Sequence, residues 1–323
     1  MPDYGSRITD KAVAKASAKI RKIYNQAEKE LNKKLLSFRK RFTLKQQLMS
    51  KLLSSGEISK ADYDSWLRGQ VFIGKRWKGK LNQLVRLIHQ TNKIAHNVVQ
   101  RFRLYVFSEN YNRYAYETEI KTGISFDIYN EDAVDKLIKD DPKMLPEWRI
   151  DEEKDYIWNR QKVENAITQG IIQGESVDQI AERLAKTLAS TNMNKMRMFA
   201  RTALNGAQNA GRQKQMEDAA EMGIEVKKKW LATLDNRTRD AHRGLDANIV
   251  PFNRPFHSSL GDIMFPGDMN AAPANVYNCR CAMRTLYPKY EDENAPDWRE
   301  DEIIDGQTYA EWKQGKKKKG LEK

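Results

Sequence analysis

Segments that would place this chain in a membrane or among secreted proteins are missing from its sequence. No apolar run approaches the roughly 20 residues that a membrane helix needs. The N-terminus is polar and lacks the apolar core of a signal peptide, and two cysteines among 323 residues are too few for a disulfide framework. We therefore expect a soluble protein that is made in a cytosol and has no membrane partner.

The motifs that mark common catalytic sites are also missing. The chain has no Gly-rich phosphate loop, no serine nucleophile elbow and no His-Glu-x-x-His motif. The segment from Gly174 to Lys186 lacks the spacing of a Walker motif. These absences favour a binding or structural protein over an enzyme, so we expect no catalytic residues.

Positive charge is abundant, and it is concentrated in the N-terminal third. Residues 1–110 contain 24 lysines and arginines against 8 aspartates and glutamates, a net +16, so the remaining residues sum to −3 of the total of +13. A phosphate backbone, bound without sequence preference, is the simplest partner, and an acidic protein surface such as the inside of a shell is the alternative. The residues that we expect to contact double-stranded DNA are Lys19, Arg21, Lys22, Lys33, Lys34, Arg39, Lys40, Arg41, Lys75, Arg76, Lys78 and Lys80.

Apolar residues at three- and four-residue steps predict that residues 1–120 form a basic arm of long helices. The seam is clearest over residues 7–42, which no Pro or Gly interrupts. This seam either packs on neighbouring helices of the same chain, which we favour, or forms a coiled coil. Further helices of the arm are expected over residues 43–53, 59–67 and 75–118.

Residues 121–223 are expected to form a central helical region. The predicted helices cover residues 131–139, 152–172, 177–188 with Ser176 as a cap, and a last stretch from Ser190 or Thr191 to Met222. No Gly/Ser linker or internal repeat is evident. We therefore expect continuous helix, and no flexible tether, between the arm and the C-terminal domain.

The composition of residues 224–290 predicts a small α+β domain with a few antiparallel strands. Irregular segments rich in Pro and Gly separate the elements, which we expect to be a strand over Glu225–Leu234, a short helix over Asp240–Leu245 capped by Thr238, and a strand over Val276–Leu286. The chain as a whole is therefore predicted to be α+β and predominantly helical.

Both cysteines fall in the second of these strands. Because residues two apart on a strand face the same side, Cys279 and Cys281 are expected to point one way, and Asn278, Arg280 and Ala282 the other. A disulfide between the two cysteines is disfavoured, since neighbours on one strand face lie too far apart for unstrained geometry.

Residues 291–323 are expected to form a tail that is first acidic and then basic. Residues 290–305 are rich in Asp and Glu, residues 307–314 read as a docking segment or short helix, and Lys316–Lys319 read as a disordered basic end.

A metal site is one interpretation of the residues around the cysteines. His242, Cys279 and Cys281 are ligands of the kind that zinc takes, and Asp235, Asp240 or Asp268 would supply the fourth. The alternative is a packed polar cluster in which the histidine is hydrogen-bonded and the cysteines act as small buried apolar residues.

The charged residues of the same stretch have a simpler interpretation. Arg237, Arg239, Asp240 and Asp246 are expected to form ion pairs that hold the irregular loops. A solvated turn without such pairs is the alternative.

Several short motifs follow one another in the second half of the chain. They read Asp-x-Arg-Thr-Arg-x-x-His-x-x-Leu-Asp, then Phe-Pro-Gly-Asp, then Val-x-Asn-Cys-Arg-Cys. In this order, over about residues 150–290, the chain resembles the Mu F-like family of phage minor head proteins. The matching residues are Trp230, Asp235, Arg237, Thr238, Arg239, His242, Leu245, Asp246, Phe265, Pro266, Gly267, Asp268, Val276, Asn278, Cys279, Arg280 and Cys281. Upstream, Arg201-Thr202 resembles the family's Arg-Thr-Glu helix, but Ala203 stands where an acidic residue is usual.

This resemblance implies a low-copy virion protein that acts in head assembly, bound to the portal, the inner capsid or both. The partners implied are the portal protein and the major capsid or scaffolding protein, with double-stranded DNA added by the basic arm. Self-association is an open alternative. The implied location is the virion head, and the host cytoplasm during assembly.

Two enzyme interpretations remain as alternatives. His242 with nearby Asp and Cys residues offers a metal-dependent phosphodiesterase or nuclease, or another effector delivered with the genome. Arg201-Thr202 with Glu291-x-Glu293 faintly resembles ADP-ribosyltransferases. Acidic pairs are common in acidic tails, so the assembly protein is the preferred interpretation.

Overall fold

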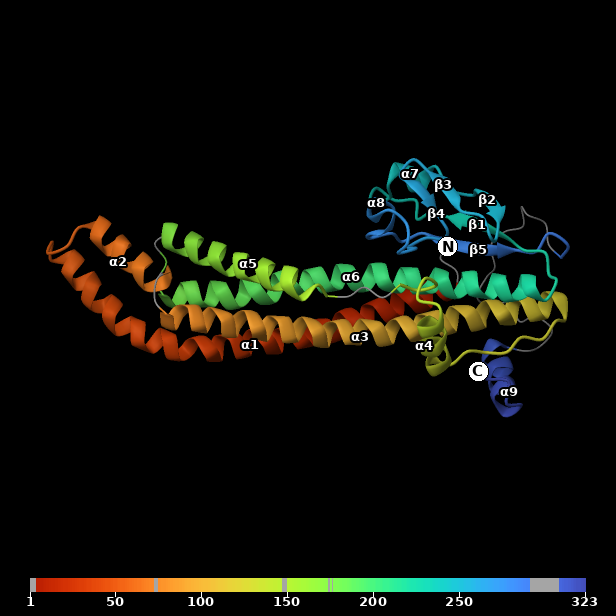
Figure 1. Cartoon of the computed structure of the whole chain (residues 1–323), viewed down its shortest axis with the longest axis horizontal. Helices are drawn as coiled ribbons and strands as arrows, with labels where there is room; N and C mark the ends of the chain where they lie inside the picture. The colour runs from red at the N-terminus through yellow and green to blue at the C-terminus, as the bar shows by residue number, and fades with distance from the viewer. Residues whose placement is uncertain (1–3, 73–74, 147–149, 174, 176, 291–307) are drawn as a thin grey trace. The chain divides into compact units, whose positions relative to one another are not determined.

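The computed structural model describes residues 4–72, 75–146, 150–173, 175, 177–290 and 308–323, and the chain divides into two compact units. Unit 1 comprises residues 1–17, 98–148 and 198–323, and unit 2 comprises residues 18–97 and 149–197. The long helices α1 (Tyr4–Ser54), α3 (Lys75–Thr122) and α6 (Val177–Glu221) each contribute one part to each unit (Figure 1). Each unit therefore combines segments that are distant in the sequence.

The regular elements described in unit 2 are all helices. It holds parts of α1, α3 and α6 together with α2 (Lys60–Phe72) and α5 (Glu152–Ile172). Its core is made of leucine, isoleucine, valine and alanine side chains, among them the fully buried Leu31, Leu35, Leu84, Ile88 and Ala185. The apolar seam of the α1 sequence thus packs on neighbouring helices of the same chain.

A layer of polar side chains crosses unit 2 next to this core. Asn92 is buried and accepts a hydrogen bond from the Tyr24 hydroxyl at 2.6 Å, while its amide nitrogen donates to Asp155 at 3.0 Å. His89 Nδ1 lies 3.0 Å from Asp155 Oδ2, and Asn92 also donates to Asn192 at 2.9 Å. These hydrogen bonds join side chains on different helices, and a shift of one helix along another would break them. The layer therefore favours one register of the helices.

Two breaks that the sequence predicts within long helices are wrong. Thr43 does not begin a new helix, because α1 continues to Ser54, and neither Ser190 nor Thr191 interrupts α6. Thr191 Oγ1 instead donates to the carbonyl of Thr187, one turn back, which lets a hydroxyl residue remain inside a helix. The expected cap at Ser176 lies outside the described residues.

A capping box of Ser59 and Asp62 opens α2. The Asp62 carboxylate accepts from the Ser59 backbone N–H at 3.1 Å, and the Ser59 hydroxyl accepts from the Asp62 backbone N–H at 3.1 Å. Two N–H groups that would otherwise lack partners are satisfied in this way.

Unit 1 combines helices with a small sheet, as the predicted α+β class requires. The sheet is antiparallel and consists of β1 (Lys227–Leu231) between β2 (Ile249–Pro251) and β5 (Ala282–Leu286). Lys229 of β1 lies opposite both Ile249 and Arg284. A separate two-stranded hairpin, formed by residues 256–258 and 261–263, lies between β2 and β5 in the sequence. The elements are α4 (Glu131–Asp140), β1 (Lys227–Leu231), α7 (Asp240–Arg243), β2 (Ile249–Pro251), β3 (Phe256–Ser258), β4 (Gly261–Ile263), α8 (Pro273–Val276), β5 (Ala282–Leu286) and α9 (Tyr309–Lys318).

The sheet lies against α6 (Figure 1), and buried polar groups join the two. Asn209 accepts from the Met283 backbone N–H at 3.1 Å, and the buried guanidinium of Arg212 donates to the Met283 carbonyl at 2.7 Å. The apolar core around this contact includes Phe107, Tyr111 and Leu204. Contacts with α6 therefore fix the position of β5 and of the segment before it.

The second predicted strand is wrong in its first half. Residues 273–276 form α8, and Asn278 has a φ of 58°, in the left-handed region that interrupts a strand. Regular pairing begins only at Ala282. Cys279 and Cys281 therefore lie on an irregular segment and not on a strand.

The helix cap predicted at Thr238 is also wrong. Arg239 occupies the N-cap position of α7 without a side-chain hydrogen bond. The Thr238 hydroxyl is used elsewhere, because it donates to the carbonyl of Thr233 in the preceding turn.

The C-terminal segment is ordered where the sequence predicts disorder. A capping box of Thr308 and Glu311 opens α9, Trp312 is buried, and the Lys316 ammonium lies 2.7 Å from the Glu119 carboxylate. The expected acidic stretch at residues 291–305 lies outside the described residues. Among the helices that the structure describes, none is long and apolar enough to cross a membrane.

Candidate functional site

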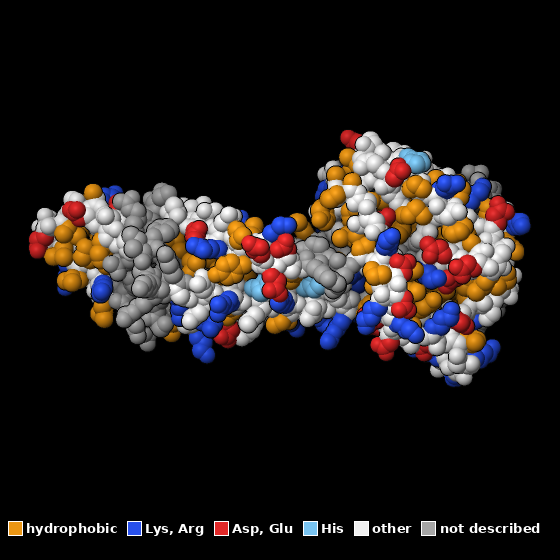
Figure 2. Space-filling view, in the orientation of Figure 1, with side chains coloured by type: hydrophobic (Ala, Val, Ile, Leu, Met, Phe, Trp, Pro, Cys, Tyr) orange, Lys and Arg blue, Asp and Glu red, His pale blue; other side chains and the backbone are white. Residues whose placement is uncertain are grey.

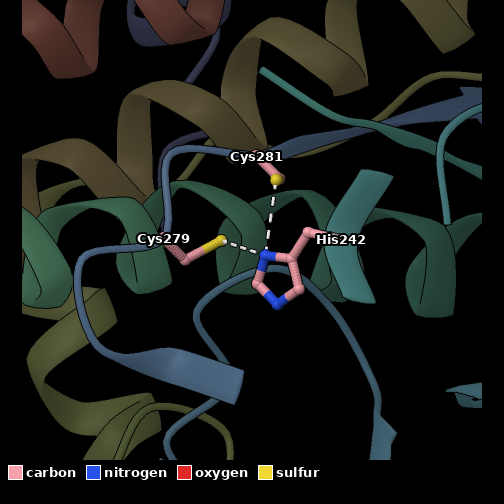
Figure 3. Close-up of side chains that lie close together, drawn as sticks. All are labelled: His242, Cys279 and Cys281. Carbon is pink, nitrogen blue, oxygen red and sulfur yellow. Dashed lines mark hydrogen bonds between the residues drawn. The ribbon is translucent and has the colours of Figure 1, made fainter. Parts of the chain in front are cut away.

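His242, Cys279 and Cys281 form a buried cluster in unit 1, as the sequence predicts. Figure 3 shows both sulfur atoms directed at the same ring nitrogen. Cys279 Sγ and Cys281 Sγ each lie 3.6 Å from His242 Nδ1. The three side chains expose only 1–2% of their surface, and their potential ligand atoms all lie within 4.8 Å of one another.

The local backbone explains how two cysteines off a strand still face one histidine. Asn278, at positive φ, turns the chain, and its backbone N–H donates to the Thr202 hydroxyl of α6 at 3.0 Å. Arg280, between the cysteines, points to the opposite side, where it reaches Asp235. The alternation predicted for a strand is therefore preserved by a segment anchored at Asn278 and Arg280.

Asn275 fixes the orientation of the imidazole. Its amide nitrogen donates to the Gly261 carbonyl at 3.0 Å, which identifies the other atom as the oxygen. That oxygen lies 2.9 Å from His242 Nε2, and it only accepts hydrogen bonds, so Nε2 carries the ring proton. The Nδ1 lone pair then faces the two sulfur atoms.

The two thiols influence each other's protonation. The hydrogen bond from Cys279 lowers the pKa of Cys281, with a further contribution from His242. The same hydrogen bond raises the pKa of Cys279, and burial raises it further. The pair therefore favours a state with one thiolate, on Cys281, which is the form that binds metals.

The structure places Asp235 away from this cluster. Both of its carboxylate oxygens accept from the Arg280 guanidinium, at 2.5 and 2.6 Å, and this ion pair holds the pKa of Asp235 well below its usual range. Asp240 is fully exposed, and Asp268 accepts from backbone N–H groups of its own turn. Among the described residues, the group with metal-ligand geometry holds only the histidine and the two cysteines.

The ion pairs predicted in this stretch form only in part. Arg237 lies 3.8 Å from Asp235, but Arg239 donates to the Tyr277 carbonyl and Asp246 accepts from the Ala232 backbone N–H. These contacts hold the loops through backbone groups more than through paired charges.

The remaining motif residues pack the cluster and its support. The Trp230 ring packs edge-on against the His242 ring, with the two ring centroids 5.4 Å apart. The Pro266 carbonyl accepts a hydrogen bond from Asn209 of α6 at 2.9 Å. Gly267, with a φ of 83°, lies directly on Gly206 of α6, where a Cβ atom on Gly206 would approach the Gly267 oxygen to 2.6 Å. This motif thus brings a turn into backbone contact with a helix, which requires glycine at both positions.

Sequence reasoning missed Asn275 and Asn209, and it did not predict that Thr202 contacts the segment that bears the cysteines. Asn275 lies one residue before Val276, where the matched motif begins, and a single buried asparagine has no pattern that would identify it. Asn209 and Thr202 lie on α6, far from the motifs in sequence, and only the fold brings them to the segment before β5.

A second feature of unit 1 lies next to the cluster. A cavity of ≈ 530 Å³ is lined by Cys279, by Arg201, Arg237 and Arg280, and by Asp10 of α1, among others. Burial raises the pKa of Asp10, against the opposite effect of Arg201 and Arg280. Arg201, from the motif that resembles Arg-Thr-Glu, therefore faces this cavity and not the metal-ligand group.

All twelve basic residues that we expect to contact DNA lie in unit 2. This unit contains 27 lysines and arginines against 13 aspartates and glutamates, a net +14. Unit 1 contains 30 against 31, a net −1. Lys19, Arg21, Lys22 and Lys33 are exposed and Lys34 and Lys80 are half-buried, while the side chains of Arg39, Lys40, Arg41, Lys75, Arg76 and Lys78 lie outside the described ones.

The motifs that resemble a family of phage head proteins therefore lie together in unit 1, around α6 and the segment before β5. A family model described as Phage Mu protein F like protein matches residues 161–284. The minor head protein GP7 of Bacillus phage SPP1 is 30% identical over 312 residues, which cover 91% of this chain and 94% of that protein. The chain therefore belongs to the Mu F-like family of phage minor head proteins.

Other relatives share only part of the chain. An NAD(+)–arginine ADP-ribosyltransferase of Enterococcus faecalis is 34% identical over 156 residues, or 47% of this chain and 31% of that protein. An uncharacterized protein of Haemophilus influenzae is 29% identical over 140 residues, or 42% of this chain. No solved structure matches the chain.

Proposed function

We propose that the chain is a virion component that docks through unit 1 on the portal protein or the inner capsid and directs unit 2 at packaged DNA. The observation that supports this most directly is the division of charge, with +14 in unit 2 and −1 in unit 1. Two units of one chain that differ this strongly in charge suit two different partners.

The placement of charge in unit 2 supports a polyanion as its partner. On the face shown in Figure 2, lysine and arginine side chains are spread over the helices and are not collected in one pocket. A distributed field of this kind suits a phosphate backbone bound without sequence preference, because the binding energy comes from displaced counterions. An acidic lining of the shell is the alternative partner of the same surface.

Unit 1 has the features expected of a protein-docking unit. Its net charge is near zero, and several large apolar side chains around the sheet are exposed, including Leu234 at 64% and Tyr277 at 49%. Apolar and aromatic side chains at the surface contribute most to protein–protein association. The portal protein and the major capsid or scaffolding protein are the partners that we propose for it.

Similarity to an ADP-ribosyltransferase does not make that activity the better proposal. The similarity covers less than a third of that enzyme. In this chain Thr202 is buried and binds the Asn278 backbone, and Ala203 replaces the acidic residue of the motif. The acidic pair Glu291 and Glu293 lies outside the described residues. We therefore propose an assembly role without catalysis.

Site-specific photo-crosslinking in assembled heads tests the division of labour. A photoreactive residue at Arg21, exposed in unit 2, is expected to link to DNA, and one at Leu234, exposed in unit 1, to the portal or a capsid protein. If position 21 links only to capsid protein, unit 2 lines the shell and its proposed contact with DNA is wrong. If neither position links to any head component, the docking proposal fails as well.

A further inference from the structure

We propose that His242, Cys279 and Cys281 bind one zinc ion, held by His242 Nδ1 and the two sulfur atoms. This site goes beyond the assembly role, because it concerns what holds the domain together and does not depend on the partner. Three side chains from two separate segments of unit 1 supply the ligands.

The distances within the cluster match a zinc coordination sphere. In a tetrahedral site with Zn–S of about 2.3 Å and Zn–N of about 2.05 Å, nitrogen and sulfur ligands lie about 3.6 Å apart. Both sulfur–nitrogen distances here are 3.6 Å. Both sulfur–nitrogen separations are therefore those expected of ligands to one ion, even though Cys279 and Cys281 have only one residue between them.

The tautomer of His242 also suits a ligand. Asn275 holds the proton on Nε2 through its amide oxygen at 2.9 Å, so the bare Nδ1 faces the sulfurs. Metal-binding histidines commonly donate their other ring N–H to an oxygen acceptor in this way, which fixes the ring and raises its basicity. Asn275 acts here as a positioning residue.

A cluster held by hydrogen bonds alone accounts less well for the arrangement. Nδ1 has a single lone pair, and two thiols lie at the same distance from it. Only one S–H group can donate well to that lone pair, and the other thiol then has only its hydrogen bond to the first sulfur, which does not explain why both sulfurs approach Nδ1 equally. A metal ion satisfies all three ligand atoms at once.

The fourth coordination position is not filled by a carboxylate in the described structure. Asp235, one of the three expected candidates for the fourth ligand, is held by Arg280, and no further His, Cys, Asp or Glu of the described residues joins the group. We assign this position to a water molecule. Three protein ligands and one water satisfy a four-coordinate zinc ion.

A zinc ion here would tie α7 to the segment before β5. The apolar cluster around it is small, with Trp230, Leu245, Phe256 and Ile263 as its other buried members. A small core of this size stabilises a domain weakly, and metal binding adds directly to the free energy of folding. The site is therefore a crosslink of the motif-bearing part of unit 1.

Metal content of the untagged, full-length chain tests the proposal. Protein expressed with zinc in the medium and dialysed under reducing conditions is expected to retain about one zinc ion per chain. After removal of zinc, added Co²⁺ is expected to produce the near-ultraviolet charge-transfer absorption of a thiolate–cobalt bond, with visible bands of tetrahedral coordination. A wild-type chain that holds no zinc and shows no such absorption would overturn the proposal, whatever the variants do.

Matched variants locate the ion. Cys281→Ala should abolish zinc retention, and Asn275→Ala should weaken zinc affinity about 10- to 100-fold, because it removes the acceptor that orients the ring. His257→Ala changes an exposed histidine paired with Asp262 and should retain all the zinc. If Cys281→Ala retains wild-type zinc, the ion lies elsewhere and the assignment is wrong. If Cys281→Ala does not fold, the cobalt spectrum of the wild-type chain decides.

Discussion

Two thiols and one amide oxygen surround the imidazole of His242, and they decide what this residue does. The sequence predicts that Cys279 and Cys281 face one side, and they do, although the strand on which that prediction rests begins only at Ala282. The ion pair between Asp235 and Arg280 could not be predicted, because several arginines lie near Asp235 in the sequence and no pattern distinguishes Arg280 from the others. Spacing predicts which side a residue faces more reliably than it predicts a partner.

A second prediction at this scale concerns catalysis. Wild-type protein incubated with supercoiled DNA and magnesium, manganese or zinc is expected to produce no nicking, because His242 and both cysteines are buried at 1–2% exposure and a phosphodiester cannot reach them. His242→Ala should lower thermal stability, and like the wild type it should show no nicking. Nicking by the wild type that disappears in a folded His242→Ala variant would instead establish a nuclease.

Lys228 is a buried cation whose protonation should make stability depend on pH. Its ammonium donates to the Met264 carbonyl at 2.8 Å and is enclosed by unit 1, and burial lowers its pKa to about 7 against the pull of Glu217 and Asp268. The unfolded chain, with an ordinary lysine pKa, binds more protons than the folded chain between about pH 7 and pH 10. The buried ammonium therefore lowers the free energy of unfolding by its full amount below about pH 7. This loss of stability shrinks as the pH rises from about 7 to about 10.

Substitution of Lys228 tests this dependence. Relative to Lys228→Met, the wild type should gain up to about 4 kcal/mol in free energy of unfolding between pH 7 and pH 10. Urea unfolding at several pH values measures the difference. Lys229→Met, on the same strand but partly exposed, is the control and should follow the wild type. Parallel curves for the wild type and Lys228→Met would show that the buried ammonium does not titrate in this range.

At the scale of elements, the helices were largely predictable and their interruptions were not. Apolar periodicity predicts α3 and α5 well, and it predicts α1 apart from the break expected at Thr43. Thr43, Ser190 and Thr191 resemble helix starts, but each lies inside a long apolar pattern that continues past it, and packing of that pattern outweighs a local preference. Local signals therefore mark a helix end only where the apolar pattern also ends.

The C-terminal helix α9 shows the same limit from the other side. Its four-lysine run predicts a solvated tail, yet Trp312 and Lys316 are buried. The rings of Trp312 and Tyr116 pack with their centroids 5.4 Å apart. The Lys316 ammonium binds Glu119 and Ser125. A charge run does not reveal the buried partners of one of its members.

Removal of the α9 anchor should therefore destabilise unit 1. Trp312→Ala is expected to lower the free energy of unfolding by about 3–5 kcal/mol, because it deletes a large buried side chain from the core. Lys318→Ala, an exposed residue of the same helix, should change it by less than about 0.5 kcal/mol. Chemical denaturation monitors both variants, and equal, small effects would mean that α9 does not contribute to the folded core.

At the scale of the whole molecule, the sequence predicts the imbalance of charge but not its boundary. A count along the chain places the excess in residues 1–110, whereas the fold collects +14 in unit 2 by combining residues 18–97 with residues 149–197. Long helices that pass from one unit to the other make a domain discontinuous in sequence, and no linear composition shift marks such a boundary. The proposed contact with DNA depends on this division.

Salt-dependent DNA binding by the full-length chain tests that contact most directly, with charge-reversal variants as the comparison. Lys19→Glu, Arg21→Glu and Lys22→Glu together reverse three exposed charges of unit 2, and Lys289→Glu, Lys318→Glu and Lys319→Glu reverse three exposed charges of unit 1. Both triple variants change the net charge equally. Fluorescence anisotropy with a labelled duplex at several salt concentrations gives affinity and salt slope.

We expect the wild-type affinity to fall steeply with salt and to be independent of DNA sequence. The unit 2 variant should bind at least about tenfold more weakly, with a slope smaller by about 2 to 3, because each lost phosphate contact removes about 0.9 from it. The unit 1 variant should remain within about threefold of the wild type. Absence of binding in dilute salt, binding that is indifferent to salt, or equal losses in the two triple variants would contradict the account.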